Sequence, residues 1–312
     1  MSFKNKIFVL CNSDSLALPI IRELAQSESL AGVGLVNKPK QKRVLKPLVE
    51  ELVESDKVYL ISKPQFLKEL KSALSASKAD VVWVITFPWL IPSELLNFPK
   101  LGFYNFHFGL LPKYKGIDPV FWQIRMKEKE GGLTVHRMTE KVDEGPVILQ
   151  EKLTIIPGET YAMHCNRLGE AAVTWIKSII EIQNTTQQSF LELEVVEVID
   201  QKPSTNDLSI DWNTESAEDI EWKVNAANPK YSGIRTSCNG RELKILEVTP
   251  VAMQEKREAQ PGQIVYADSV YGIIVHCHGG ECLRITMVKS TDGYLSGVKL
   301  FNLGMTEGQI FV

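Results

Sequence analysis

Residues 80–86 read Asp-Val-Val-Trp-Val-Ile-Thr, an unbroken apolar run between two polar residues. Successive side chains of a β-strand point to opposite faces of the sheet, so a strand without a polar side is buried on both faces. Strands of this kind are typical of parallel sheets that are covered by helices on both sides. The run therefore constrains the chain to a layered α/β arrangement.

The sequence around this run alternates between strand and helix patterns, which favours a Rossmann-like, mainly parallel sheet with helices on both faces. Further strands are predicted at residues 7–11, 31–36, 58–61, 102–108, 133–138 and 147–156. Helices are predicted at 16–26 (with Ser15 as its cap), 43–55, around 66–74, from Asp118 as cap to about 129, and 160–182.

Composition changes after this region. The 312 residues suffice for about two domains. Residues 183–207 are rich in Gln, Thr, Ser and Glu, which indicates a linker, with one extended segment expected at 191–199. A short helix at 217–226 and several short strands separated by Gly and Asn then predict a small β-barrel. These strands are expected at 243–248, 263–266, 273–277 and 282–288.

Charge and cysteine content limit the class of protein. The formal net charge is −3, so the overall balance does not direct the chain to nucleic acid. Five scattered cysteines after a short polar N-terminus predict free thiols in the reducing cytoplasm, without a secretory segment. No apolar run reaches the roughly 18 residues of a membrane span, so no membrane association is expected.

Polar side chains stand at the end of one predicted strand. Asn105 and His107 are two residues apart, so they share a face of strand 102–108 and lie at its carboxyl end. Ligands bind at that end of the strands in open α/β sheets. Asp143 lies between two later strands, just before Gly145 and Pro146. The sequence thus predicts one cleft with an amide donor, an imidazole and a carboxylate.

These residues belong to longer motifs. Residues 105–116 read N-F-H-F-G-L-L-P-K-Y-K-G, and G-G-L-T-V-H at 131–136 is followed by D-E-G-P-V-I-L-Q at 143–150. Together they resemble the folate-dependent formyltransferase family. Residues 208–246 and 297–311 are similar to the OB-like C-terminal domain of methionyl-tRNA formyltransferases. The resemblance implies a catalytic domain at 1–183, a linker at 184–207 and an OB-like domain at 208–312.

The resemblance also implies roles. The formyl donor is 10-formyltetrahydrofolate, the acceptor is a primary amine, and no metal is required. Asn105 and His107 stabilise the oxyanion, and Asp143 orients the imidazole and accepts the proton of the amine. The folate-binding residues expected from the resemblance are Phe87, Pro88, Trp89, Leu90, Ile91, Val142 and Leu110.

Three departures bear on the acceptor. Gly109 stands where most methionyl-tRNA formyltransferases have Ser, and the basic segment 37–48 is short and lacks glycine. Residues 203–312 hold 10 Lys and Arg against 14 Asp and Glu, whereas a tRNA-binding domain needs basic surface. We therefore expect a small or carrier-borne amine, such as an amino sugar nucleotide or an aminoacyl group, with methionyl-tRNA as the alternative.

Other interpretations stay open at this stage. Water in place of the amine gives a 10-formyltetrahydrofolate hydrolase, and loss of catalysis gives a folate-binding module. Residues 12–15 lack the glycine-rich phosphate loop of a dinucleotide binder. They also lack the glycine-and-serine loop of the purine-pathway members of the family, which disfavours glycinamide ribonucleotide as the substrate. His136 is interpreted as structural. The segment His276–Cys282 is interpreted as a hairpin rather than a zinc site, because it lacks paired C-x-x-C spacing. The oligomeric state is not predicted.

Overall fold

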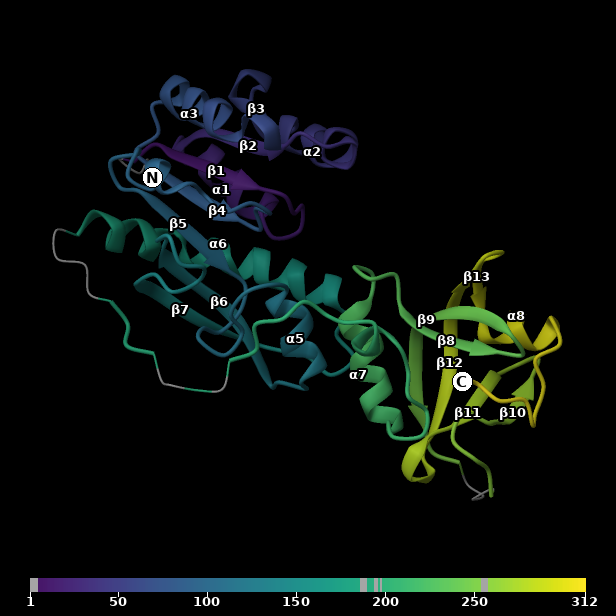
Figure 1. Ribbon diagram of the computed structural model, residues 1–312. Coiled ribbons are helices and arrows are strands. Elements are labelled where there is room, and N and C mark those ends of the chain that lie inside the picture. The colour runs from purple at the N-terminus through teal and green to yellow at the C-terminus, as the bar shows by residue number, and fades with distance from the viewer. Residues whose placement is uncertain (1–4, 186–189, 194–195, 197, 254–257) are drawn as a thin grey trace. The chain divides into compact units, whose positions relative to one another are not determined.

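The computed structural model describes residues 5–185, 190–193, 196, 198–253 and 258–312 (Figure 1). Contacts within the chain divide it into two compact units. The first, here called the α/β unit, comprises Met1–Pro119, Glu130–Thr154 and Cys165–Asp200. The second, the barrel unit, comprises Val120–Lys129, Ile155–His164 and Gln201–Val312. The boundaries 1–183, 184–207 and 208–312 stay a prediction.

The α/β unit is built on a seven-stranded sheet in the order β3-β2-β1-β4-β5-β6-β7. Strands β1 to β5 pair in parallel, and β6 and β7 add two antiparallel pairs at one edge. The strands are β1 (Ile7–Cys11), β2 (Leu30–Val36), β3 (Val58–Ile61), β4 (Val81–Ile85), β5 (Phe103–His107), β6 (Glu130–Arg137) and β7 (Val147–Thr154).

Helices cover both faces of this sheet, because β4 has apolar side chains on both sides. Val82 and Val84 pack in a cluster with Leu70 and Leu74 of α3 (Phe66–Ser77) on one face. Trp83 points to the other face, where its indole N–H donates to Gln183 of α6 (Tyr161–Asn184) over 3.3 Å. All five residues of β4 are buried. The predicted α/β class with a mainly parallel sheet is confirmed.

The remaining helices of the chain are short. They are α1 (Leu18–Gln26), α2 (Lys46–Glu50), α4 (Ser93–Leu96), α5 (Pro119–Arg125), α7 (Ala217–Ala227) and α8 (Gly297–Asn302). Single turns of other helix types are η1 (Gln41–Leu45), η2 (Ser55–Lys57), η3 (Lys63–Gln65), η4 (Asn206–Leu208) and η5 (His278–Gly280). In the described part of the chain, no helix has the length and apolar content to cross a bilayer.

Several predicted helix ends were wrong. Helix α1 begins at Leu18, and no side chain caps it, because the carbonyl of Asp14 already accepts the N–H groups of Ala17 and Leu18. Helix α5 ends at Arg125, since Lys127 adopts a left-handed conformation with φ of 55° before β6 begins at Glu130. The predicted helix 43–55 is shorter, because a π-helical turn at Gln41–Leu45 precedes the five residues of α2.

The barrel unit contains a second, antiparallel sheet in the order β10-β11-β12-β9-β8, with β13 paired to β12. Isolated bridges from Cys238 to Phe311 and from Gln263 to Ile310 link the β8 and β10 edges through one segment, which closes the sheet. The strands are β8 (Ile234–Cys238), β9 (Arg241–Val251), β10 (Ile264–Asp268), β11 (Gly272–His276), β12 (Cys282–Ser290) and β13 (Gly293–Ser296). This arrangement confirms the predicted small β-barrel.

The segment expected to be extended, 191–199, is only partly described, since residues 194, 195 and 197 lie outside the described residues. Leu191 forms an isolated bridge with Val147, and the N–H of Ile199 donates to the carbonyl of Lys113 over 2.6 Å. Both contacts lie within the α/β unit. Asp200, the residue after this segment, is the last residue of the α/β unit.

Candidate active site

Strand β5 contains Asn105 at its centre and His107 at its carboxyl end. Strand β5 pairs with β4 on one side and with β6 on the other, so it lies inside the sheet and its backbone is fixed. His107 is buried and Asn105 is half-buried. Opposite residues of an antiparallel pair share a face, and the partner of Asn105 across the ladder is His136. The register thus brings a second imidazole to the site.

Asp143 is the centre of this cluster. Its Oδ1 accepts the side-chain N–H of Asn105 over 3.0 Å and lies 3.3 Å from Nε2 of His136. Its Oδ2 accepts the backbone N–H of Gly116 over 2.9 Å and lies 3.5 Å from Nδ1 of His107. The three residues singled out from the sequence therefore meet, and the carboxylate has polar neighbours from β5, β6 and the loop after β5.

The backbone around Asp143 explains the Asp-x-Gly-Pro pattern. Asp143 adopts the left-handed conformation with φ of 51°, which Asp tolerates better than most residues. A Cβ on Gly145 would lie 1.7 Å from the carbonyl oxygen of Arg137, so only glycine permits this approach to β6. The carbonyl of Pro146 accepts the N–H of Arg137 over 2.9 Å. These features anchor the turn and direct the carboxylate toward β5.

The electrostatics of the cluster favour an ionised carboxylate beside an uncharged imidazole. Burial raises the pKa of Asp143, but the hydrogen bond with His136, the electrostatic attraction of the His107 ring and the N–H of Gly116 outweigh it and lower the pKa to about 2. Burial lowers the pKa of His107, and the nearby Asp143 carboxylate opposes this effect only in part. At neutral pH Asp143 is therefore ionised, and the His107 ring is neutral with its Nε2 against the carbonyl of Tyr114.

The loop after β5 is held by residues that sequence reasoning did not select. The Thr134 hydroxyl donates to the carbonyl of Gly109 over 2.6 Å and accepts the N–H of Leu111 over 3.2 Å. Gln150 donates to the carbonyl of Leu111 over 2.9 Å. Thr134 and Gln150 are cross-strand partners on β6 and β7, so the strand register, which no local motif records, brings them together.

Gly109 is required by its neighbours. A Cβ at this position would lie 2.5 Å from Cβ of Pro119 and 3.0 Å from Nε2 of His107. That ring nitrogen also contacts the carbonyl of Tyr114. A serine at position 109 would therefore push against the His107 ring. The glycine therefore fits the packing of this loop, and its bearing on the acceptor stays a prediction.

The segment expected to bind folate follows the carboxyl end of β4, which is parallel to β5 and ends on the same side of the sheet. Phe87 and Trp89 are half-buried and pack with Phe66, at ring-centroid distances of 5.6 and 5.3 Å. Leu90 and Val142 have 72% and 46% of their surface exposed. The others are Pro88, which is exposed, Ile91, which is buried, and Leu110, which is half-buried. Exposed apolar side chains beside a polar cluster suit a flat heterocyclic ligand.

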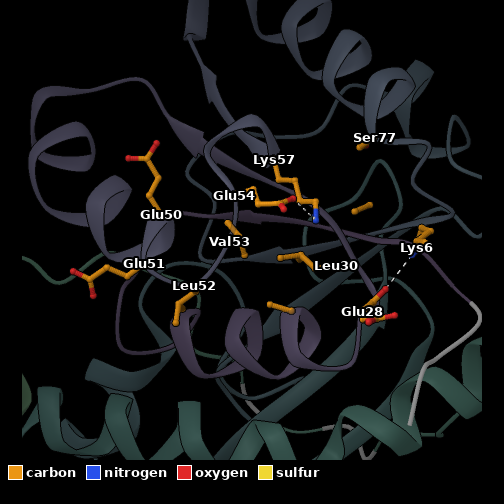
Figure 2. A pocket seen from close by; sticks show the side chains of 12 residues that line it. Lys6, Glu28, Leu30, Glu50, Glu51, Leu52, Val53, Glu54, Lys57 and Ser77 are labelled. Atoms are coloured by element: carbon orange, nitrogen blue, oxygen red, sulfur yellow. Dashed lines mark hydrogen bonds and ion pairs between the residues drawn. The ribbon is translucent and has the colours of Figure 1, made fainter.

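A cavity of about 840 Å³ lies at the opposite end of the parallel strands, where β1 and β2 begin (Figure 2). It is lined by carboxylates such as Glu28 and Glu54, and Lys57 pairs with Glu54 over 3.0 Å. None of the cluster residues lines it. Ligands of open α/β sheets bind at the carboxyl ends of the strands, so we assign it no role in the chemistry.

The segment His276–Cys282 forms the predicted hairpin between β11 and β12. His276 and Cys282 are cross-strand partners, and Gly279 and Gly280 supply left-handed conformations in the turn. Among the residues that the structure describes, no three or more His, Cys, Asp and Glu side chains gather closely enough to hold a metal ion.

Comparisons with known proteins agree with this architecture. The Formyl transferase model matches residues 5–180, and the model Formyl transferase, C-terminal domain matches residues 202–304. The fold and these matches define a one-carbon group transferase. The chain belongs to the formyl transferase family, and 10-formyltetrahydrofolate is the formyl donor. The family expected from residues 105–116 and 131–150 is confirmed.

Individual relatives differ in the acceptor that their names state. The methionyl-tRNA formyltransferase of Acidovorax ebreus is 31% identical over 235 residues, which are 74% of this chain and 71% of that protein. HypX from Aquifex aeolicus, solved with tetrahydrofolic acid, is 15% identical with a TM-score of 0.63 over 97% of this chain. This chain covers 48% of HypX, about half of its length.

A sugar N-formyltransferase has a similar fold. WlaRD, a sugar 3N-formyl transferase solved with dTDP and 5-N-formyl-THF, is 17% identical with a TM-score of 0.60. The match covers 89% of this chain and 96% of that one. The chain therefore formylates an amine, and the comparisons differ on the kind of amine.

Proposed function

We propose that this chain transfers the formyl group of 10-formyltetrahydrofolate to a small or carrier-borne primary amine, and that Asn105, His107 and Asp143 perform the chemistry. The observation that carries the proposal is the convergence of the Asn105 amide and the His107 ring on the Asp143 carboxylate. Phe87, Trp89 and Leu90 after β4, together with Val142, provide the apolar surface for the pterin.

In this mechanism the amine attacks the formyl carbon, and the carbonyl oxygen becomes a tetrahedral oxyanion. The side-chain N–H of Asn105 donates to that oxygen, and the N–H of His107 does so once it leaves the carbonyl of Tyr114. One such donor is worth about 3 kcal/mol of barrier. Asp143 accepts the proton of the amine, directly or through a water. Its low pKa keeps it ionised at neutral pH. Collapse of the intermediate breaks the bond between the formyl carbon and N10 of the folate, N10 takes up the proton held by Asp143, directly or through a water, and tetrahydrofolate and the formamide leave.

Charge supports a small or carrier-borne acceptor over tRNA. A protein that holds tRNA neutralises phosphates with Lys and Arg, and these contacts supply most of its non-specific affinity. Residues 203–312 carry a net charge of −4, from 10 Lys and Arg against 14 Asp and Glu. Methionyl-tRNA is the second candidate, favoured by the name of the Acidovorax ebreus relative.

The acceptor is tested by supplying 10-formyltetrahydrofolate with a panel of amines. The panel contains nucleotide-linked amino sugars, carrier-bound amino acids and methionyl-tRNA, and mass spectrometry identifies the formylated product. We expect at least one small or carrier-borne amine to react at least tenfold faster than methionyl-tRNA. A mobility-shift titration at moderate salt should show weak tRNA binding.

Two results would redirect this proposal. Tight binding and fast formylation of initiator methionyl-tRNA would replace the preferred acceptor with the second candidate. Release of formate at the full rate without any amine would indicate a hydrolase. The cytoplasmic location expected from the cysteines stays a prediction; all five cysteines are buried.

The cluster also predicts a pH dependence of stability. The folded-state pKa of Asp143 is about 2, below its ordinary value of 3.8, so the stabilisation is present above pH 4 and is lost as pH falls toward 2. The shift corresponds to about 2 kcal/mol, of which about half is lost by pH 3. Urea unfolding at pH 6 and pH 3 should show a smaller loss for Asp143→Asn than for the wild type. Equal losses would contradict the low pKa.

A further inference from the structure

Three cations stand in one row across the barrel unit. Arg235 on β8 is the register partner of Lys244 on β9, and Lys244 is in turn the partner of Lys289 on β12. Directly opposite residues of an antiparallel pair point to the same face, about 5 Å apart. Like charges in this position destabilise a sheet, so the row costs stability that some other requirement must justify.

The cations of this row are not neutralised within the protein. In the part of the chain that the structure describes, no carboxylate lies within 4.0 Å of the nitrogens of Arg235, Lys244 or Lys289. Lys244 makes one long hydrogen bond of 3.5 Å to the carbonyl of Tyr231. Lys289 lies over the ring of Tyr294, 5.8 Å from its centroid. The positive charge is therefore available to an external anion.

A groove of about 480 Å³ contains the row, within the size range of small-molecule sites. Hydroxyl groups of Ser209, Ser237, Ser290 and Thr291 line it with the three cations. Glu242 also lines it, as the register partner of Ser237. Since Glu242 repels an anion, the favourable position for phosphate is the part of the row formed by Lys244 and Lys289.

An aromatic side chain extends the row. Tyr294 on β13 is the register partner of Lys289, and 68% of its surface is exposed. A base stacks well on such a ring, and stacking tolerates any base. From Tyr294 to Lys244 the row crosses two strand spacings, or about 10 Å. That length suits a nucleoside whose base lies on the tyrosine and whose two phosphates lie over the lysines.

We propose that this row, Arg235, Lys244, Lys289 and Tyr294, is a binding site for a nucleoside diphosphate on the barrel unit. Arg235 and the lysines bind the phosphates, the hydroxyls of Ser237 and Thr291 donate to the remaining phosphate oxygens, and the base stacks on Tyr294. The site requires no formyl transfer, so it stands or falls independently of the chemistry at Asp143.

The test is calorimetric titration of the full chain with ADP, UDP and inorganic pyrophosphate at low ionic strength. We expect ADP and UDP to bind with similar affinity. The double variant Lys244→Gln/Lys289→Gln should bind ADP and UDP at least tenfold more weakly than the wild type does. Tyr294→Leu should weaken the binding of ADP at least fivefold and leave the binding of pyrophosphate unchanged. Lys299→Gln and Tyr271→Leu, which remove a lysine and an exposed tyrosine outside the groove, should bind as the wild type does.

Thermal melting checks the same row without a catalytic assay. The double variant should melt at or above the wild-type temperature, because two opposed positive charges are gone, and ADP should raise the melting temperature of the wild type only. Absence of ADP binding at millimolar concentration would overturn the proposal, as would equal binding by the wild type and the double variant. Binding of a single-stranded oligonucleotide without binding of ADP would also overturn it, in favour of a nucleic-acid surface.

Discussion

Replacement of Asp143 by Asn is expected to lower kcat at least about 100-fold, the scale of a lost general base together with a misoriented imidazole. The carboxylate accepts from Asn105 and Gly116 and faces both His107 and His136, so an amide disturbs all four contacts. Single-turnover kinetics with a saturating amine measure the effect. Binding of 5-formyltetrahydrofolate should change by less than about threefold, since Asp143 acts on the transferred group.

Two further variants make this result specific. Asp143→Ala should lose at least as much activity, but the φ of 51° at this position adds backbone strain, so the Asn variant is the cleaner test. Glu144→Gln is the matched control, because the neighbouring carboxylate is 45% exposed and pairs with Lys115 over 2.6 Å. Near-normal turnover in Asp143→Asn, or an equal loss in Glu144→Gln, would refute the assignment of Asp143.

Asn105→Ala is expected to lower kcat by at least about 100-fold through loss of a donor to the oxyanion. The amide lies in the middle of a strand that is paired on both sides, so truncation removes the donor without moving the backbone. The effect should appear in kcat, with KM for the folate changed little, because the oxyanion exists only in the transition state. Steady-state kinetics separate these two parameters.

The control for this variant lies at the carboxyl end of another strand of the same sheet. Asn37 follows β2, and its amide donates to the Ser62 hydroxyl over 2.9 Å. Asn37→Ala should retain wild-type kcat. A rise in KM for the folate with unchanged kcat in Asn105→Ala would indicate that the amide binds the donor in its ground state, which is a different role from the one proposed.

The distribution of charge on the barrel unit also bears on the choice of acceptor. The barrel unit is acidic overall, yet Arg235, Lys244 and Lys289 gather on one face of its sheet. A net charge averages over the whole surface, whereas a ligand responds to the local field. Three cations within one groove are too few for a long polyanion and sufficient for two phosphates. This distribution agrees with the preference for a small acceptor over tRNA.

The sequence by itself determined the α/β class, the small barrel and the family, and it predicted that Asn105, His107 and Asp143 lie together, as they do in the structure. It did so because alternating burial and short motifs are local patterns, and strand 80–86 or the run 105–116 carries its signal within a few residues. Helix ends were less predictable, since the left-handed Lys127 and the π-helical turn at 41–45 depend on packing beyond the window of the pattern.

Only the tertiary structure decided what surrounds those residues. The register of β5 against β6 brought His136 to Asp143, and the register of β6 against β7 placed Gln150 beside Thr134 under the loop. The row of Arg235, Lys244 and Lys289 arose in the same way. Strand pairing joins residues far apart in the chain, and the energy that selects one register is spread over the whole buried face. No single motif therefore records it.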